Sequence, residues 1–200
     1  GPIRLIASTG TYPNSSATVG ALTESGDVYL WGYNNYGQCG SSAGTNQTTP
    51  VKHNGLSNID SLTGGGGGQY GHWAAIDTSG NCYTWGYNGY GQLGHGNTNN
   101  STTATQVAPQ AGIKEAKVVC AGGGSYGNSY FMLANGRLYA CGYNGYGVIG
   151  DGSTTDRTSP VLVSTVGLEA GKYVVDIFAP GGSYLDATRM ALTENGDVYG

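Results

Sequence analysis

The chain has 200 residues, of which 38 are glycine, and it carries a formal net charge of −4. Gly costs roughly 1 kcal/mol relative to Ala inside a helix but adopts tight turns freely, so this composition disfavours a helical protein and predicts many short strands. Only 10% of the residues are charged, whereas a nucleic-acid-binding surface needs clustered Lys and Arg. We therefore expect no nucleic-acid partner.

The cysteines and the apolar runs limit the class of protein further. Cys39, Cys82, Cys120 and Cys141 form no Cys-x-x-Cys pair, and we expect thiols that pack as small apolar groups. No run approaches about 18 consecutive apolar residues, and no signal-peptide pattern opens the chain. The sequence predicts no membrane insertion.

Four short apolar runs recur at matching offsets along the chain. They predict the first strand of four repeats, at 3–7, 59–63, 117–121 and 174–178. A turn-rich segment of variable length follows each run, where we expect a loop that tolerates insertions. The repeats span approximately 3–58, 59–115, 116–173 and a truncated 174–200, and together they form one domain, 1–200.

Each repeat continues with a predicted hairpin. Its second strand is expected at 18–22, 73–76, 130–133 and 189–192, and its third at 28–31, 82–85, 138–141 and 198–200. Ser-Gly or Asn-Gly stands between them in every repeat, which favours a tight turn because Gly adopts positive φ without steric cost. Both faces of the third strand are largely apolar, so we expect each sheet to be covered on both sides.

A proline-marked segment predicts a fourth strand at the outer edge of each complete repeat, at 49–51, 108–109 and 159–163. Four antiparallel strands in a repeat of about 55 residues are typical of a propeller blade. The fold class predicted is therefore an all-β propeller, with about three and three-quarter blades in this chain.

A ten-residue stretch occurs three times, as Trp31–Gly40, Trp85–Gly94 and Cys141–Gly150. With the preceding strand it forms the pattern Ala-Leu-Thr-x-x-Gly-x-Val-Tyr-x-Trp-Gly-x-Asn-x-x-Gly-Gln-x-Gly, carried by Ala21–Gly40. This pattern resembles the repeat of the regulator of chromosome condensation family. The resemblance implies a seven-bladed ring, in which further blades come from the same polypeptide or from another copy of the chain.

The repeated stretch carries a pair of tyrosines in every copy, and the chain has 16 Tyr but only two Phe. Tyr is preferred over Phe where one end of the ring meets water or a polar partner. Two interpretations stay open, a structural role between blades and a ligand-binding face. In both we expect the first member of each pair to be the more buried: Tyr33 and Tyr36, Tyr87 and Tyr90, Tyr143 and Tyr146.

Residues with catalytic or metal-binding potential form no constellation. His53, His72 and His95 occupy unrelated repeat positions and are expected to be packing or loop residues. The glycine run 64–68 lacks the Lys and helix that a phosphate loop needs. The segment 151–156 has alternating oxygen ligands but lacks the later Glu of a calcium loop. We expect no cofactor and no metal.

Four asparagines stand in Asn-x-Ser/Thr sequons, which would accept glycans on a eukaryotic secretory route: Asn14, Asn46, Asn99 and Asn100.

The predicted function is a non-enzymatic binding or structural module that recognises a protein or a glycan through its loop face. The low charge and the Gly/Ser/Thr/Asn/Tyr richness favour an extracellular or virion surface. A glycosidase or lyase would need inward carboxylates paired across blades, but only Asp27 and Asp197 recur, in turns. The resemblance implies two alternatives, an inhibitor of a secreted enzyme and, disfavoured by the acidic charge, a guanine-nucleotide exchange factor for a small GTPase.

Overall fold

The computed structural model describes residues 1–10, 16–107, 117–121, 126–133, 135–164, 174–178 and 190–199. The first sheet contains β1 (Ile3–Ser8), β2 (Thr18–Thr23), β3 (Val28–Gly32) and β4 (Gln47–Lys52). The second contains β5 (Ile59–Gly65), β6 (His72–Asp77), β7 (Cys82–Gly86) and β8 (Ser101–Gln106), with the short 3-10 turn η1 (Gly68–Tyr70) between β5 and β6.

The remaining strands form two more sheets. The third contains β9 (Lys117–Ala121), β10 (Asn128–Met132), β11 (Leu138–Gly142) and β12 (Arg157–Leu162). The fourth contains β13 (Val174–Phe178), β14 (Met190–Thr193) and β15 (Val198–Tyr199). Within each sheet the strands pair antiparallel in chain order.

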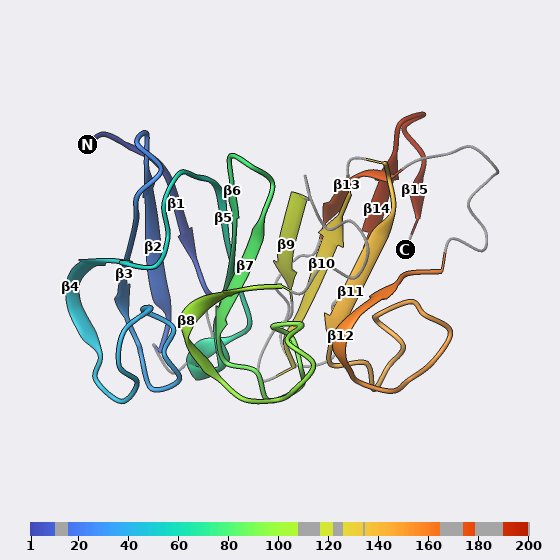
Figure 1. Ribbon diagram of the computed structural model, residues 1–200. Helices are drawn as coiled ribbons and strands as arrows, with labels where there is room; N and C mark the ends of the chain where they lie inside the picture. The colour runs from blue at the N-terminus through green and yellow to red at the C-terminus, as the bar shows by residue number, and fades with distance from the viewer. Residues whose placement is uncertain are drawn as a thin grey trace.

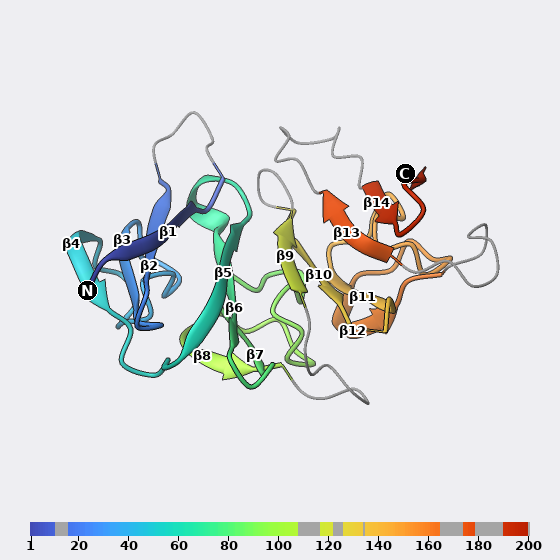
Figure 2. The same cartoon turned by 90° about the horizontal axis from the view of Figure 1, so that it is seen from above.

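The four sheets stand side by side like blades on an arc (Figure 1). Seen from above, the first strands β1, β5, β9 and β13 lie toward the inner side of the arc, and β4, β8 and β12 lie toward the outer side (Figure 2). Contacts between successive blades include β1 with β5, β5 with β9 and β10 with β13. The predicted class, an all-β propeller with four-stranded blades, is confirmed, and each sheet falls within one of the predicted repeats.

The tight turns between second and third strands form where Gly was expected. Gly26, Gly80, Gly136 and Gly196 all have positive φ, between 75° and 86°. Each donates its N–H to the carbonyl three residues earlier, at 2.9–3.0 Å. These turns all lie at the same end of the blades, the upper end in Figure 1.

The fourth strand of the second blade differs from the prediction. Residues 108–109 were expected to form it, but β8 occupies Ser101–Gln106, and 108–109 lie outside the described residues. The strand starts where the preceding loop ends, and its Thr-rich sequence pairs with β7 in the register Thr84↔Thr105 and Gly86↔Ser101. Proline therefore does not mark this strand, although Pro50 lies in β4 and Pro160 lies in β12.

Indole rings fill the space between the first two blades. Trp73 and Trp85 are fully buried and stack with ring centroids 6.3 Å apart. A Cβ added to Gly20 of the first blade would lie 2.7 Å from the Trp73 ring, so only Gly leaves room for it. The Trp85 indole N–H donates to the Gln38 carbonyl of the first blade at 3.0 Å, which ties the two sheets together.

Apolar side chains of the two end blades are exposed in the part of the chain that the structure describes. On β1, Ile3 is 50% and Ile6 is 69% exposed, and on the fourth blade Val198 is 61% exposed. Trp31, which occupies the same repeat position as the buried Trp85, is only half-buried. The same sequence position is therefore core or surface according to whether a blade packs against it.

A histidine lies in the contact between the second and third blades. His72 is fully buried, and its Nε2 lies 3.1 Å from the Ser129 hydroxyl, which donates to the Gln92 carbonyl at 2.8 Å. Burial lowers the pKa of His72 to about 4. The neutral ring is therefore the form that the folded chain accommodates.

We expect His72 to make stability depend on pH. Its folded-state pKa of about 4 lies below the ordinary 6.5. The contribution of His72 to the free energy of unfolding is therefore complete above pH 6.5 and is lost as the pH falls toward 4, because the unfolded chain then binds a proton that the folded chain does not. The free energy of unfolding contributed by this group should fall by about 2 kcal/mol between pH 7 and pH 5. Urea unfolding of the whole chain at both pH values measures the change.

The matched variant is His72→Asn, because the third blade has Asn128 at this position in the register. It should show a smaller stability difference between pH 7 and pH 5 than the unsubstituted chain. An identical difference in the two proteins would contradict the assignment to His72.

Candidate functional site

A buried asparagine closes each loop between the third and fourth strands. The Asn88 side chain donates to the carbonyls of Asn97 and Asn99 at 3.0 and 2.9 Å, and accepts the Leu93 N–H at 2.9 Å. The Asn88 N–H donates to the Asn100 side chain at 2.8 Å. Asn34 and Asn144 are equally buried and hold their loops in the same way.

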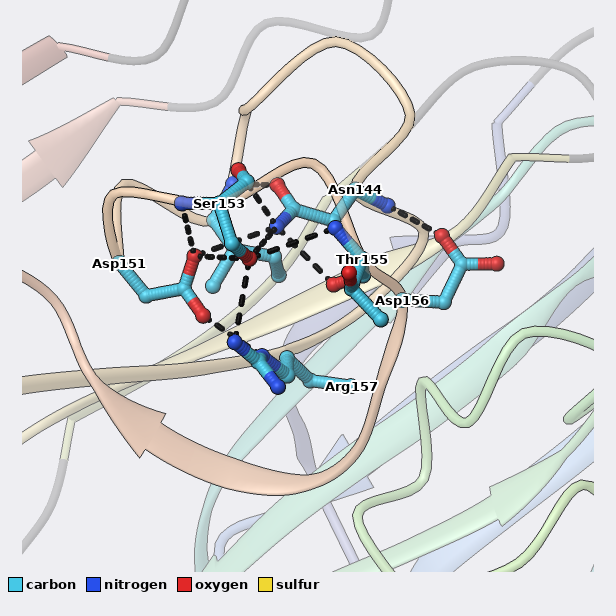
Figure 3. Close-up of polar contacts among 7 residues, drawn as sticks. Asn144, Asp151, Ser153, Thr155, Asp156 and Arg157 are labelled. Atoms are coloured by element: carbon cyan, nitrogen blue, oxygen red, sulfur yellow. Dashed lines mark hydrogen bonds and ion pairs between the residues drawn. The ribbon is translucent and has the colours of Figure 1, made fainter.

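In the third copy the loop also contains charged groups (Figure 3). Asp156 replaces the asparagine at the end of the loop, and its Oδ1 accepts the Asn144 N–H at 2.7 Å. Asp151 accepts from the Arg157 Nε at 2.6 Å and from Ser153 at 2.8 Å. The alternating oxygens of this segment thus bind its own backbone and an arginine, and the described residues include no group of three acidic, His or Cys side chains suited to a metal ion.

Each of the first two loops rests on the fourth strand of the next blade. Gly37 has φ +81°, and a Cβ there would lie 2.6 Å from the Thr102 Cα of β8. Gly91 has φ +83°, and a Cβ there would lie 2.5 Å from the Thr158 Cα of β12. Gly at this place in the loop therefore permits successive blades to pack closely.

A glutamine joins the first loop to the next blade. The Gln38 Oε1 accepts the Tyr36 N–H at 2.9 Å, and its Nε2 donates to the Gln69 carbonyl at 2.7 Å. Gln92 accepts the Tyr90 N–H in the same way, at 3.0 Å. The third copy has Val148 here and cannot make this bond.

The tyrosines of the loops form two clusters between blades, which we call the tyrosine trios. In the first trio the ring centroids lie 4.9–6.2 Å apart, and its members are Tyr36, Tyr70 and Tyr87. In the second trio they lie 4.4–5.5 Å apart, and its members are Tyr90, Tyr126 and Tyr143. Each trio takes one ring from one blade and two from the next.

The structure separates the second predicted pair, because Tyr87 and Tyr90 contribute to different trios. Tyr33 joins neither trio and donates its hydroxyl toward the Gln69 side chain at 3.4 Å. Tyr146 extends the second trio, at 6.0 Å from Tyr143.

Two members of the trios were not among the predicted site residues. Tyr70 and Tyr126 lie between the first and second strands of their blades, far in sequence from the repeated stretch. A signal for them exists, because each stands two residues before the second strand and after a glycine run. Folding of one blade brings Tyr70 to Tyr87 and Tyr126 to Tyr143, and the packing of successive blades adds Tyr36 and Tyr90.

The tyrosine side chains of these loops differ in how far they are exposed. All six trio members are half-buried, whereas Tyr146 is 66% exposed. The expectation that the first tyrosine is the more buried holds for the third pair, since Tyr143 is half-buried; in the first two pairs both members are half-buried.

The phenols of Tyr87, Tyr90 and Tyr143 are protonated at neutral pH. Burial, together with the neighbouring phenols, raises the pKa of Tyr87 to about 12. Burial likewise raises the pKa of Tyr90 and of Tyr143. The face therefore offers aromatic rings with hydroxyl groups that can donate hydrogen bonds.

The histidines with catalytic potential are packing residues. His53 is buried beside Trp85, with ring centroids 5.2 Å apart, and His95 lies 2.8 Å from the Thr84 hydroxyl. Together with His72 they lie in three separate contacts, and among the described residues none forms a hydrogen bond or ring contact with an exposed nucleophile.

The glycine run and the thiols are also structural. Gly68 donates its N–H to the Gly10 carbonyl at 3.2 Å, and a Cβ on Gly64 would lie 2.7 Å from the Ser8 carbonyl oxygen. The run thus lets the second blade approach β1. The thiols of Cys39, Cys82 and Cys141 are buried, and the side chain of Cys120 lies outside the described part.

The predicted glycan acceptors stay predictions. Asn46, Asn99 and Asn100 are exposed, although Asn46 and Asn100 each accept a backbone N–H through Oδ1. Asn14 lies outside the described residues. Within the described ranges, no helix is long and apolar enough to cross a membrane.

Comparison with known families gives three consecutive matches to one repeat. The regulator of chromosome condensation (RCC1) repeat matches residues 25–70, 79–126 and 135–182. The chain belongs to the RCC1 repeat family. Each match starts at a turn between second and third strands and extends into the next blade, so the RCC1 repeat is offset from the structural blade.

Curated relatives carry a similar RCC1 repeat sequence inside longer proteins. Mouse "Probable E3 ubiquitin-protein ligase HERC4" is 34% identical over 144 residues, which cover 71% of this chain and 13% of the relative. "Ultraviolet-B receptor UVR8" of Arabidopsis thaliana is 30% identical over 145 residues, which cover 72% of this chain and 31% of the receptor. This chain thus spans a third or less of these relatives.

Solved structures share the propeller fold. Human WBSCR16 aligns with a TM-score of 0.74 and 18% identity over 99% of this chain and 47% of that one. Prp20p of Saccharomyces cerevisiae aligns with a TM-score of 0.64 and 21% identity over 80% of this chain and 39% of that one. At these identities the likeness establishes the fold, and this chain spans less than half of each.

Substitution of Gly91 should test the contact between loop and strand. Gly91→Ala places a methyl group against the β12 backbone. Gly152 also has a positive φ, +81°, but a Cβ added there has no neighbouring atom within 4 Å. The Gly152 variant should lose about 1 kcal/mol from positive φ alone, and the Gly91 variant about 2 kcal/mol more from the clash. Denaturant unfolding of both variants measures the difference. Equal losses would show that the loop does not rest on the next blade.

Proposed function

We propose that this RCC1 segment is a non-catalytic binding module and that it binds a protein partner through the face that carries the tyrosine trios. The observation that carries the proposal is the repetition of one aromatic arrangement at two successive blade contacts. The loops that supply it lie together at the lower end of the blades in Figure 1. Half-buried tyrosines at this end form two aromatic clusters, one at each of two successive blade contacts.

The chemistry of tyrosine favours a binding face over a purely structural role. Tyr supplies large, rigid contact area at low entropic cost and keeps a polar tip, and it is enriched at the energetic centres of protein interfaces. Core packing alone would need no hydroxyl. The contacts within each trio hold the rings in place before a partner arrives, which lowers the entropic cost of binding.

The comparisons support a protein as the partner. The structure of yeast Prp20p is described together with its binding properties to Gsp1p and histones, and a second structure contains Kap60 bound to yeast RCC1 (Prp20). Those partners belong to the yeast protein. For this chain the shared propeller makes a protein-binding face the leading proposal and the exchange-factor activity a weaker one.

A glycan is the second candidate ligand, because exposed phenol rings such as that of Tyr146 can stack on sugar faces. An extracellular or virion setting, and with it inhibition of a secreted enzyme, stays a prediction from composition.

We also propose that further blades of the same polypeptide cover the exposed apolar side chains of the two end blades. Ile3 and Ile6 at one end and Val198 at the other would then be buried like their counterparts between blades. The coverage of less than half of the WBSCR16 and Prp20p chains supports this arrangement.

The tyrosine face is tested by combining Tyr36→Ala, Tyr90→Ala and Tyr146→Ala. The matched control carries Glu24→Ala, Thr78→Ala and Glu194→Ala, which change exposed side chains at the opposite end of the blades. A partner captured by the unsubstituted chain is purified and titrated against all three proteins. We expect the tyrosine variant to bind the partner at least 10-fold more weakly, which corresponds to a loss of about 1.4 kcal/mol or more of binding free energy. The control should bind the partner as tightly as the unsubstituted chain does.

Circular dichroism shows whether both variants keep the fold, and a glycan array is probed in parallel. Partner binding that is unaltered in a folded tyrosine variant overturns the proposal. Tyrosine-dependent binding to a glycan alone would replace the protein partner by the second candidate.

A further inference from the structure

The two tyrosine trios come from the same repeat positions but have different neighbours. In the third blade the residue that accepts the N–H of the loop asparagine is Asp156, at 2.7 Å, whereas in the second blade it is Asn100, at 2.8 Å. One trio therefore lies beside a carboxylate and the other beside a neutral amide of the same shape. The effect of the carboxylate can therefore be measured by comparing the two trios within one chain.

Asp156 is adjacent to two members of the second trio. It binds the N–H of Asn144, which directly follows Tyr143. On the other side, a Cβ on Gly91, next to Tyr90, would lie 2.9 Å from the carbonyl oxygen of Arg157. Burial chiefly raises the pKa of Tyr90 and of Tyr143, and the charge of Asp156 adds to the rise in both.

The carboxylate has no cation of its own in the described part of the chain. Asp156 is exposed, and the three ion pairs among the described residues involve other carboxylates. The adjacent Arg157 is bound to Asp151 and Ser153 instead. Figure 3 shows the second oxygen of Asp156 pointing away from this network.

We propose that the second trio and Asp156 form a subsite for the guanidinium group of an arginine on the partner. This inference rests on the proposed function, since it names what the partner places on the face. A guanidinium group stacks flat on aromatic rings and pairs with a carboxylate, and it is less strongly hydrated than an ammonium group. The first trio offers the rings without the charge and accepts neutral side chains.

The probe is the short peptide acetyl-Gly-Arg-Gly-amide, titrated into the full chain with backbone amide shifts followed by NMR. We expect saturable shifts at residues 90, 143 and 156, with a dissociation constant in the millimolar range. Asp156→Asn should weaken binding about 3- to 10-fold through loss of the charge pair. Asn100→Asp should introduce comparable shifts at residues 36, 70 and 87.

Both substitutions keep the side-chain oxygen that accepts the loop N–H, so the loop is retained. The peptide with citrulline in place of arginine has nearly the same shape but no charge. It should bind the unsubstituted chain no more tightly than the arginine peptide binds the Asp156→Asn variant. Raising the salt concentration to about 1 M should also weaken binding of the arginine peptide, because ions screen the exposed carboxylate.

Arginine and citrulline peptides that bind alike would overturn the inference, and so would binding that Asp156→Asn leaves unchanged. A lysine peptide that binds more tightly than the arginine peptide would also contradict it. These titrations use no partner protein. Their failure therefore leaves the tyrosine face intact, and only the partner titration with the tyrosine variant decides the proposed function.

Discussion

The contact between a loop of one blade and the fourth strand of the next is the constraint on which the remaining features depend. At Gly37 and Gly91 the loop backbone touches the neighbouring strand so closely that no Cβ fits. The buried asparagine of the same loop fixes its shape with hydrogen bonds to the loop backbone. Because buried polar groups are costly when unpaired, this fully bonded asparagine gives the loop one conformation.

The trios are a consequence of that contact. A loop held against the next blade carries its second tyrosine to two rings that belong to the neighbour, as Tyr36 reaches Tyr70 and Tyr87. Tyrosines from the same repeat positions meet again at the following contact, so the chain repeats a cluster as well as a fold. Function can then vary through single loop residues, such as Asp156 in place of Asn100, while the blade stays unchanged.

The sequence predicted most of the fold because the local signals agree with the tertiary structure. The strands, the turn at Gly26 and the loop at Asn88 each follow from residues that lie within one repeat. The prediction for the fourth strand of the second blade was wrong, because a proline was taken as its marker while Thr-rich residues directly after the loop formed β8. The candidate site was predicted in part, since the loop tyrosines were identified and Tyr70 and Tyr126 were not.

The sequence by itself determined the repeat, the four-stranded blade and the RCC1 pattern, since glycine turns and alternating apolar residues act over a few residues. Only the tertiary structure decided which tyrosines meet. Tyr90, Tyr126 and Tyr143 come from separate segments of two blades, and their clustering depends on how one sheet packs on the next. The same packing buries Trp85 and leaves Trp31 half-buried, because burial depends on a neighbouring blade that no local pattern encodes.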